Sequence, residues 1–249
     1  MRELAPSRDQ LARVLLGGPS IAVRFPSAMH EGNRQGSMFM CLDKQYDFAS
    51  LHTKSRNQTR RGLENCTVEQ LSFSDLAARG YSLNVDTYRR QGKDPQSFSV
   101  EKWQRFCDAA SETRGFEAWG AWAKGNLAAF AVTALVEDSL HIHTQASATE
   151  YLDLYPNNAL TFLLTKQKIS SPEIASICYG VKTLTRSTLD DYKSRMGYEL
   201  KTFAERIVFN PLLQPILSLG GDRIIHWIAK RRPTQAWRRL SLILDDIRA

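Results

Sequence analysis

The chain has 249 residues, of which 43% are hydrophobic and 24% are charged, a composition typical of a globular protein with one large or two small cores. Thirty-three basic residues against 26 acidic ones leave a net charge of +7, which favours an anionic partner such as phosphate, nucleic acid or a membrane surface. The longest apolar stretch, residues 127–136, is about half of what a membrane-crossing helix needs. The sequence therefore argues against a spanning helix and indicates a soluble or peripheral protein.

The cysteines are widely spaced and form no CxxC pair; they are Cys41, Cys66, Cys107 and Cys178. This spacing predicts neither a disulfide framework nor a zinc site, so we expect no bound metal and a reducing, cytoplasmic setting. Charged residues precede any apolar run at the N-terminus, which predicts that no signal peptide is present.

Periodicity and turn residues predict three helices and three strands in the first half of the chain. The expected elements are a helix at 11–16, strands at 21–25, 38–42 and 66–71, and helices at 74–91 and 99–112. A basic segment with Lys54, Arg56, Arg60 and Arg61 precedes the strand at 66–71.

The second half begins with an antiparallel meander, whose middle strand is apolar at nearly every position and is expected to be buried on both faces. The expected strands are 116–123, 127–136 and 140–146. A helix capped by Asn157 or Asn158 should follow, with Leu160, Leu163 and Leu164 facing inward. A buried strand at 176–180, a short helix ending at Gly197 and a return strand at 199–209 complete the pattern.

This order of elements is a mixed α/β layout, and it carries three short motifs: Tyr155-Pro-Asn-Asn-Ala-Leu160, Tyr179-Gly180 and Tyr192-Lys193-Ser-Arg-Met-Gly197. Together with the pair Arg60-Arg61, they resemble the acetyltransferase (GNAT) superfold, and within it the Fem-type aminoacyltransferases that build peptidoglycan bridges. The resemblance covers about residues 54–209. It implies a GNAT-like core with a mostly antiparallel sheet flanked by helices, an N-terminal extension or partial first domain at 1–53, and a basic amphipathic helical tail at 210–249.

One segment departs from the acetyl-CoA users of this superfold, which place a glycine-rich phosphate loop after the long central strand. The corresponding segment here runs from Ala146 to Pro156 and contains no glycine. A loop without glycine cannot easily bring its backbone close to phosphates, which puts acetyl-CoA in doubt and suits the Fem-type branch. No tightly bound cofactor is expected, and the donor stays open between an acyl-CoA and an aminoacyl-tRNA.

Lys193 is the first candidate for catalysis. Leu189, Tyr192 and Met196 should form the buried side of its helix, which places Lys193 at the edge of that face. In the resembling family the matching lysine stabilises the charge that develops on the acyl carbonyl; the alternative is a solvated helix lysine. Tyr155 is a second candidate, as a general acid or as a residue of the cleft wall.

His143 is the third catalytic candidate. It shares a strand face with His141 and could deprotonate an acceptor amine or hydroxyl near neutral pH, and no third ligand at suitable spacing supports a metal site. The substrate-binding candidates are Asn157 and Asn158 at a helix start, Tyr179 in its motif, and Arg60 and Arg61 as an anionic-substrate or tRNA contact. A solvated basic helix face is the alternative for the two arginines.

The sequence therefore predicts transfer of an acyl or aminoacyl group to an amine or hydroxyl acceptor, and the resemblance implies a small-molecule or glycan-precursor acceptor from cell-envelope or polysaccharide synthesis. Two alternatives stay open: an acetyl-CoA-dependent N-acetyltransferase with an atypical donor loop, and a non-catalytic basic RNA-binding or interaction module. Residues 222–249 could rest on anionic lipid, which would make the cytoplasmic protein peripheral at the inner membrane face, or pack on their own domain.

Overall fold

In the computed structural model, the residues that can be described are 3–18, 20–28, 34–93, 99–182, 188–213 and 231. The chain forms two compact units. The smaller consists of Met1–Ser37, Lys182–Arg186 and Thr202–Ala249, and the larger of Met38–Val181 and Ser187–Lys201. The domain boundaries expected near residues 54 and 209 stay a prediction, and the tail beyond 213 lies outside the described residues except at Arg231.

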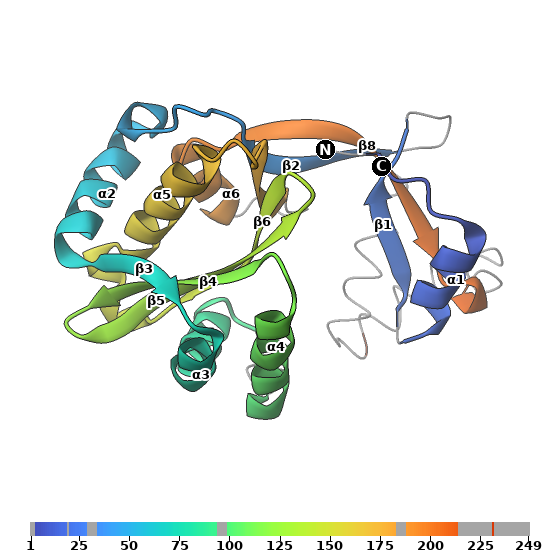
Figure 1. The fold of residues 1–249 in the computed structure, drawn as a ribbon, viewed down its shortest axis with the longest axis horizontal. Coiled ribbons are helices and arrows are strands. Elements are labelled where there is room, and N and C mark those ends of the chain that lie inside the picture. Colours follow the sequence, from blue (N-terminus) through green and yellow to red (C-terminus); the bar gives the residue numbers. More distant parts are fainter. Residues whose placement is uncertain are drawn as a thin grey trace. The chain divides into compact units, whose positions relative to one another are not determined.

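The strands of the described part hydrogen-bond in the order β1-β8-β2-β7-β6-β5-β4-β3 (Figure 1). Their bounds are β1 Ala22–Pro26, β2 Arg34–Cys41, β3 Thr67–Leu71, β4 Phe116–Ala123, β5 Asn126–Val136, β6 Ser139–Ser147, β7 Ser176–Val181 and β8 Glu199–Phe209. The pairs β1–β8, β2–β7, β3–β4, β4–β5 and β5–β6 are antiparallel, whereas β6 and β7 run parallel. The predicted mixed α/β fold with a mostly antiparallel sheet is confirmed.

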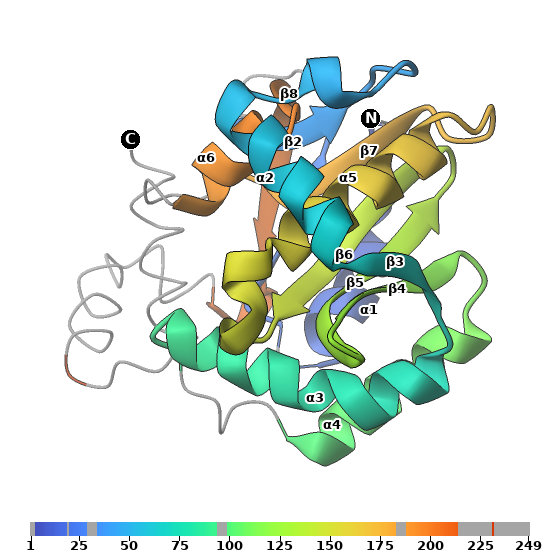
Figure 2. The ribbon, with the colours of Figure 1, turned by 90° about the vertical axis from the view of Figure 1, so that its left-hand side faces the viewer.

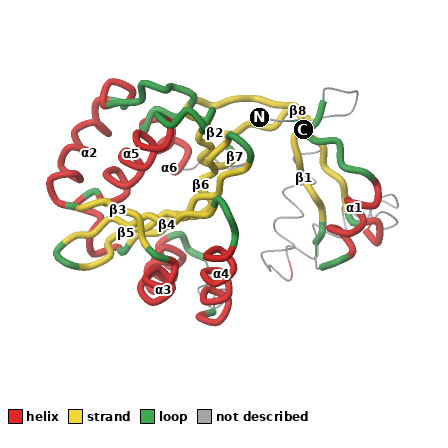
Figure 3. The backbone as a smooth tube through the Cα atoms, viewed as in Figure 1, coloured by secondary structure: helices red, strands yellow, loops and turns green. Residues whose placement is uncertain are grey.

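Helices cover both faces of the sheet in the larger unit (Figures 2 and 3). On one face lie α2 (Thr53–Asn65), α5 (Pro156–Ile169) and α6 (Thr188–Arg195), and on the other α3 (Phe73–Arg90) and α4 (Val100–Glu112). Strand β5 lies between these layers and is buried from Leu127 to Thr133, as the meander predicted. None of the described helices is long and apolar enough to cross a membrane.

The core on the α5 side contains Leu160 and Leu164, both fully buried, together with Phe162, Ile177 and Met196. The core on the α3 side is centred on Leu76, Trp103 and Phe130. Trp103 stacks on Phe106 at 5.6 Å and tilts against Phe130 at 5.5 Å, which joins α4 to the sheet. Two separate apolar cores therefore hold the sheet between its helix layers.

The smaller unit contains α1 (Arg8–Leu16), β1 and most of β8. A capping box starts α1, because the Ser7 hydroxyl accepts from the Gln10 amide while the Gln10 side chain accepts from the Ser7 amide. Asn210 donates to the carbonyls of Leu15 and Ser20, at 2.7 and 3.0 Å, and so ties the end of β8 to α1.

Helix α2 and the 3-10 helix η3 (Thr149–Leu154) were not among the expected elements. Helix α2 occupies the basic segment, which has few apolar residues but buries Ser55, Thr59 and Gly62 against its neighbours. The 3-10 helix η3 occupies the glycine-free segment. In α2 small or polar side chains make the buried contacts, whereas η3 buries no residue and packs on the core through the half-buried Tyr151 and Leu154.

Candidate functional site

Lys193 lies on α6 and is almost fully buried, with 4% of its surface exposed. Its Nζ donates to the carbonyl of Val181 at 3.3 Å and lies 3.6 Å from Oδ1 of Asp190. It also lies over the rings of Phe39 and Tyr179, at 4.9 and 5.7 Å from their centres. Burial lowers the pKa of Lys193, and the Asp190 carboxylate opposes that shift by stabilising the ammonium form.

The expected position of Lys193 at the edge of an apolar helix face is wrong. Leu189 is 44% exposed, while Met196 is fully buried beside Lys193. Because α6 has only eight residues, contacts with β7 decide which of its faces is buried, and these contacts include the Val181 carbonyl and the Tyr179 ring. The helix therefore buries a cation together with its counter-charge, which apolar periodicity does not predict.

Strands β6 and β7 pair over only three positions, from Ser139 with Ser176 to His141 with Cys178. Beyond this point a side-chain contact joins the two strands, because the Tyr179 hydroxyl donates to Oε1 of Gln145. Tyr179 is buried, and burial raises its pKa, so its hydroxyl stays protonated at neutral pH. A polar cluster thus forms where the parallel pairing ends.

Asn157 and Thr161, both on α5, complete this cluster. The Gln145 amide donates to Oδ1 of Asn157 at 3.0 Å and to Oγ1 of Thr161 at 3.3 Å. The hydroxyl of Tyr192 lies 3.0 Å from the carbonyl of Asn157 and 3.1 Å from the Thr161 hydroxyl. We call Gln145, Asn157, Thr161, Tyr179 and Tyr192 the amide–tyrosine cluster.

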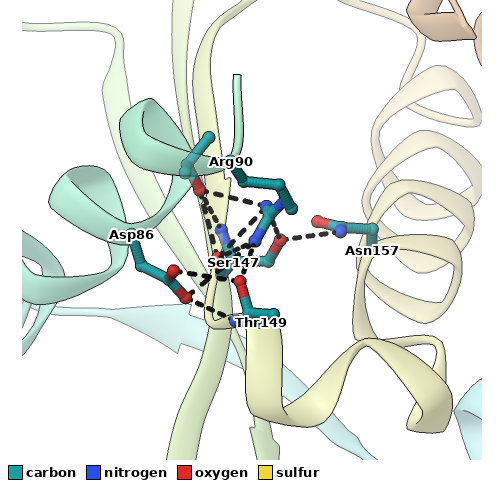
Figure 4. A network of polar contacts seen from close by, with 6 residues as sticks. Asp86, Arg90, Ser147, Thr149 and Asn157 are labelled. Atoms are coloured by element: carbon teal, nitrogen blue, oxygen red, sulfur yellow. Dashed lines mark hydrogen bonds and ion pairs between the residues drawn. The ribbon is translucent and has the colours of Figure 1, made fainter. Parts of the chain in front are cut away.

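A second polar network begins at Asn157, whose amide donates to Oγ of Ser147 at 2.9 Å (Figure 4). Arg90 also donates to this Oγ, at 3.0 Å, and to Oγ1 of Thr149 at 2.8 Å. Asp86 accepts from both the amide and the hydroxyl of Thr149, with the hydroxyl at 2.9 Å. Asp86, Arg90, Ser147 and Thr149 form what we call the Arg90 network, which links α3 to the amide–tyrosine cluster through Asn157.

The glycine-free segment after β6 uses its backbone N–H groups within the protein. The amide of Thr149 donates to Asp86, that of Tyr151 to Ala148, and that of Tyr155 to Leu152. The Asp86 carboxylate therefore occupies the start of this segment.

The predicted N-cap at Asn157 or Asn158 is wrong, because α5 starts at Pro156 with Tyr155 as its cap residue. Tyr155 adopts a left-handed backbone, with φ of 55°. Its carbonyl accepts from the amides of Asn158 and Ala159, at 3.1 and 3.2 Å. Proline suits the first helical position, since it has no N–H to satisfy and its φ is already helical.

The predicted residues fall into separate groups. Lys193, Tyr179 and Asn157 come together in or beside the amide–tyrosine cluster. Asn158 is buried behind it, with its amide 3.5 Å from Sδ of Met196. Tyr155 lies under Arg61, whose guanidinium is 4.9 Å from the ring centre and 3.4 Å from the hydroxyl.

The two arginines remain on the surface. Arg60 is exposed and lies over the Phe48 ring at 5.4 Å, separately from the Arg61–Tyr155 pair. Arg56, by contrast, is half-buried and donates to the carbonyls of Phe48 and Leu51, so its role is to hold the chain before α2. In the basic segment, Arg56 therefore stabilises the fold, whereas Arg60 and Arg61 are exposed to solvent.

His143 lies apart from the other candidates. It is exposed and stacks on Phe106 of α4 at 5.7 Å, whereas Gln145 contacts α5 on the opposite face of the sheet. A β-bulge explains this, because Thr144 pairs with Val132 and Ile142 with Thr133, which leaves His143 as an extra residue. Within the described ranges, no three His, Cys, Asp or Glu side chains converge in the way metal ligands do.

A shallow cavity of about 580 Å³, widely open to solvent, lies beside the Arg90 network. Its walls come from α3, from the start of β5 and from the segment 148–151, and they include Arg79, Leu83, Asp86, Leu127 and Glu150. Asp86 belongs both to the cavity wall and to the network. The cavity is thus connected by hydrogen bonds to the cluster beside Lys193.

The sequence interpretation did not identify Asp86, Arg90, Gln145, Ser147 or Thr161 as site residues. One signal was available: Asp86 and Arg90 are spaced i,i+4 on one helix face, which suits a charged pair. In the structure Nη1 of Arg90 lies 3.9 Å from Oδ2 of Asp86. The contacts to Ser147 and Thr149 join segments about 60 residues apart in sequence, and local spacing could not reveal them.

No protein-family model matches this sequence, and no curated protein matches it. Among solved structures it is similar to FemX, with a TM-score of 0.59 and 13% identity, over 76% of this chain and 66% of that one. It is also similar to a protein of unknown function from Bacteroides thetaiotaomicron, with a TM-score of 0.50 and 12% identity, covering 80% of this chain and 66% of that one. A third similar structure is the C-terminal domain of a lysylphosphatidylglycerol synthetase from Agrobacterium fabrum, with a TM-score of 0.50 and 12% identity, covering 78% and 67%.

The chain spans about two thirds of the length of these structures. At such low identity the likeness concerns the fold. The expected resemblance is confirmed at that level: the chain has a Fem-like GNAT fold.

Proposed function

We propose that this protein is an acyl- or aminoacyltransferase that moves an activated acyl group to an amine or hydroxyl acceptor by direct attack. The observation that carries the proposal is the position of Lys193. Its buried ammonium lies over Tyr179, which belongs to the amide–tyrosine cluster where β6 and β7 stop pairing. The Arg90 network joins this cluster to a cavity large enough for a small ligand.

Lys193 supplies the electrostatic part of the reaction. Attack on an acyl carbonyl places negative charge on its oxygen, and a fixed cation in a water-poor site stabilises that charge by several kcal/mol. The bond from Lys193 to the Val181 carbonyl is long, at 3.3 Å, and an ammonium has three donors. We assign Lys193 the role of binding the acyl oxygen while Asp190 keeps it protonated.

The acceptor attacks the donor directly, so no covalent enzyme intermediate is required. Attack forms a bond between the acceptor nitrogen or oxygen and the acyl carbon, which gives a tetrahedral intermediate. Its collapse breaks the bond to the donor's leaving oxygen or sulfur, and the proton that the acceptor loses passes to that leaving group. Gln145 and Asn157 would orient the acyl group beside Lys193, since their amides are already held by Thr161 and Ser147.

The donor that suits this chain best is an aminoacyl ester such as an aminoacyl-tRNA. Asp86 places a carboxylate at the Thr149 amide, where the pyrophosphate of an acyl-CoA would meet a negative charge. Arg60 and Arg61 are exposed and could bind phosphates of the RNA backbone. An acyl-CoA remains the second candidate donor, and an N-acetyltransferase with an atypical donor loop the second candidate function.

A small-molecule or glycan-precursor acceptor from cell-envelope synthesis is the choice that the Fem-like fold supports. A cytoplasmic protein with a peripheral contact at the inner membrane face fits that role. The basic segment 222–249 would make this contact, and apart from Arg231 it lies outside the described residues.

A donor screen tests the function. The full chain is mixed with acyl-CoAs and with aminoacylated tRNA mimics, and thermal unfolding is recorded before transfer of an isotope-labelled acyl group to amines is measured by mass spectrometry. We expect an aminoacyl mimic to raise the melting temperature and to give transfer, and we expect Lys193→Met to lower the transfer rate at least a hundredfold.

Lys166→Met is the matched control. Lys166 also lies beside a carboxylate, 3.4 Å from Asp47, and over an aromatic ring, 5.7 Å from the centre of Phe162, but it is exposed. Its variant should transfer at the wild-type rate. Absence of both stabilisation and transfer with every donor would exclude the transferase, and salt-sensitive RNA binding that survives Lys193→Met would favour the RNA-binding module instead.

A further inference from the structure

The cavity beside α3 carries opposite charges at its two ends. Arg79 and Asp86 both line it, and they are seven residues apart on one helix. At a rise of 1.5 Å per residue, their Cα atoms are about 10 Å apart along the helix axis. Seven residues are close to two full turns, so both side chains leave α3 on the same face.

The acidic end is held in place by the segment after β6. Asp86 accepts from the amide and the hydroxyl of Thr149, which fixes its carboxylate. A carboxylate can accept about four hydrogen bonds, so Asp86 can also receive donors from a ligand. Glu150 follows Thr149 in the chain and lines the same cavity, which adds a second carboxylate at this end.

The basic end is held by an aromatic ring. The guanidinium of Arg79 lies over the ring of Trp122 on β4, 5.5 Å from its centre. Trp122 pairs with Leu127, and Leu127 lines the cavity. The cation therefore lies near the start of β5, while its polar edge can still donate to an anion.

The middle of the cavity is mixed in polarity. Ser82 and Leu83 lie on α3 between the two charged residues, and Asn126, Leu127 and Tyr151 belong to the other walls. A ligand that matches this order has a cationic group, an extended middle and an anionic group, with its two charges separated on the scale of the ~10 Å between the Cα atoms of Asp86 and Arg79.

We propose that this cavity binds a linear substrate whose ammonium group lies at Asp86 and Glu150 and whose carboxylate or other anionic group lies at Arg79. The proposal rests on the proposed function for the role of this ligand as the acyl acceptor. The ammonium end would lie at Asp86, which Thr149, Arg90 and Ser147 connect by hydrogen bonds to the cluster beside Lys193. The anionic end would fix the register of the substrate on α3.

A series of ω-amino acids tests the site without any acyl donor. Binding of 4-aminobutanoate, 6-aminohexanoate and 8-aminooctanoate to the full chain is measured by titration calorimetry. We expect affinity to rise along the series, because only the longest probe can reach both Asp86 and Arg79. Octanoate and 8-aminooctanamide each lack one charge, and each should bind at least tenfold more weakly than 8-aminooctanoate, as expected for the loss of a charge-assisted contact.

Substitutions at the cavity wall test whether 8-aminooctanoate binds in the cavity. Asp86→Asn and Arg79→Met should each weaken 8-aminooctanoate at least tenfold, while Arg89→Met, an exposed position on the same helix that does not line the cavity, should not change its affinity. Ser82→Trp fills the cavity from an exposed helix position and should abolish binding with little effect on folding. This variant keeps the test decisive if Asp86→Asn perturbs the segment at Thr149.

The results separate this site from the proposed function. Binding of 8-aminooctanoate that depends on Arg79, Asp86 and Ser82 supports the site, even if no donor gives transfer. Absence of binding, equal affinity for octanoate, or wild-type affinity in Arg79→Met and Ser82→Trp overturns it, even if Lys193-dependent transfer to other amines is found.

Discussion

Lys193 and Asp190 form an ion pair one turn apart on α6, with Nζ 3.6 Å from Oδ1 and with 5% and 14% of their side chains exposed. A charge at this depth is stabilised by its partner, because little water reaches either group. The pair therefore determines both the charge state of the candidate catalytic lysine and part of the stability of α6.

Asp190→Asn should destabilise the protein by roughly 2–4 kcal/mol, because it leaves the Lys193 ammonium buried without its counter-charge. Urea unfolding at neutral pH measures this. The double variant Asp190→Asn/Lys193→Met should recover most of the loss, since no charge then remains buried. A double variant as unstable as the sum of its single changes would show that the two residues do not interact.

Stability should depend on pH through Lys193. Burial lowers the pKa of Lys193 in the folded protein below the ordinary value of 10.5. At pH values between the folded pKa and 10.5, the unfolded state binds more protons than the folded state, so the stability of the wild-type protein rises with pH. Lys193→Met has no such group. The stability difference between the two proteins should therefore shift in favour of the wild type as pH approaches 10.5, as measured by urea unfolding at several pH values.

Above pH 10, buried tyrosines should make the stability of the protein fall as pH rises. Burial raises the pKa of Tyr198 well above 10, so its contribution is fully present below pH 10 and is lost as pH rises further, because only the unfolded state ionises. The expected slope is about 1.4 kcal/mol per pH unit for each such tyrosine. Tyr198→Phe should reduce the pH dependence of the unfolding free energy above pH 10 by the share of one tyrosine. The same pH dependence in the variant and the wild type, measured by urea unfolding, would contradict this.

Arg90→Met should destabilise the protein by roughly 1–3 kcal/mol, because Ser147 and Thr149 lose a charged donor close to a buried strand end. Arg89→Met removes an equal charge from an exposed neighbouring position and should lie within about 0.5 kcal/mol of the wild type. Arg90→Lys keeps the charge but not the two-pronged geometry and should recover only part of the loss. Thermal and urea unfolding of the three variants decide this.

Gly62→Ala should destabilise the protein although alanine is the better helix former. The new Cβ would lie 2.6 Å from the Tyr155 carbonyl oxygen and 3.2 Å from the Ala159 Cβ, so α2 and α5 would have to separate. Such overpacking costs about 1–3 kcal/mol, which exceeds the gain of about 1 kcal/mol in helix propensity. Gly18→Ala meets no atom within 4 Å and is the control, with a stability close to that of the wild type.

Much of the fold was predictable because it depends on local patterns. The meander 116–146 alternates apolar strands with polar turns, and the helix at 99–112 has an apolar stripe that includes Trp103 and Cys107. Gly197 ends α6 with φ of 84°, as the sequence suggested. Periodicity of 2 or 3.6 and turn residues are properties of a few neighbouring residues, so they can be read from the chain directly.

The site depended on contacts that local patterns do not encode. A bulge of one residue at His143 separates the face of that histidine from the face of Gln145, and no residue type marks such a bulge. The burial of Lys193 on α6 depends on Phe39, Tyr179 and Asp190, and the first two of these lie on strands β2 and β7.

The sequence by itself determined the class of fold, the absence of glycine between Ala146 and Pro156, and the choice of Lys193 as the residue to test. Only the tertiary structure decided that Asp86 binds the Thr149 amide in that segment and that Arg90 connects Ser147 to α3. The physical reason is distance along the chain: these hydrogen bonds join residues about 60 positions apart, and the packing of α3 on the sheet brings them together.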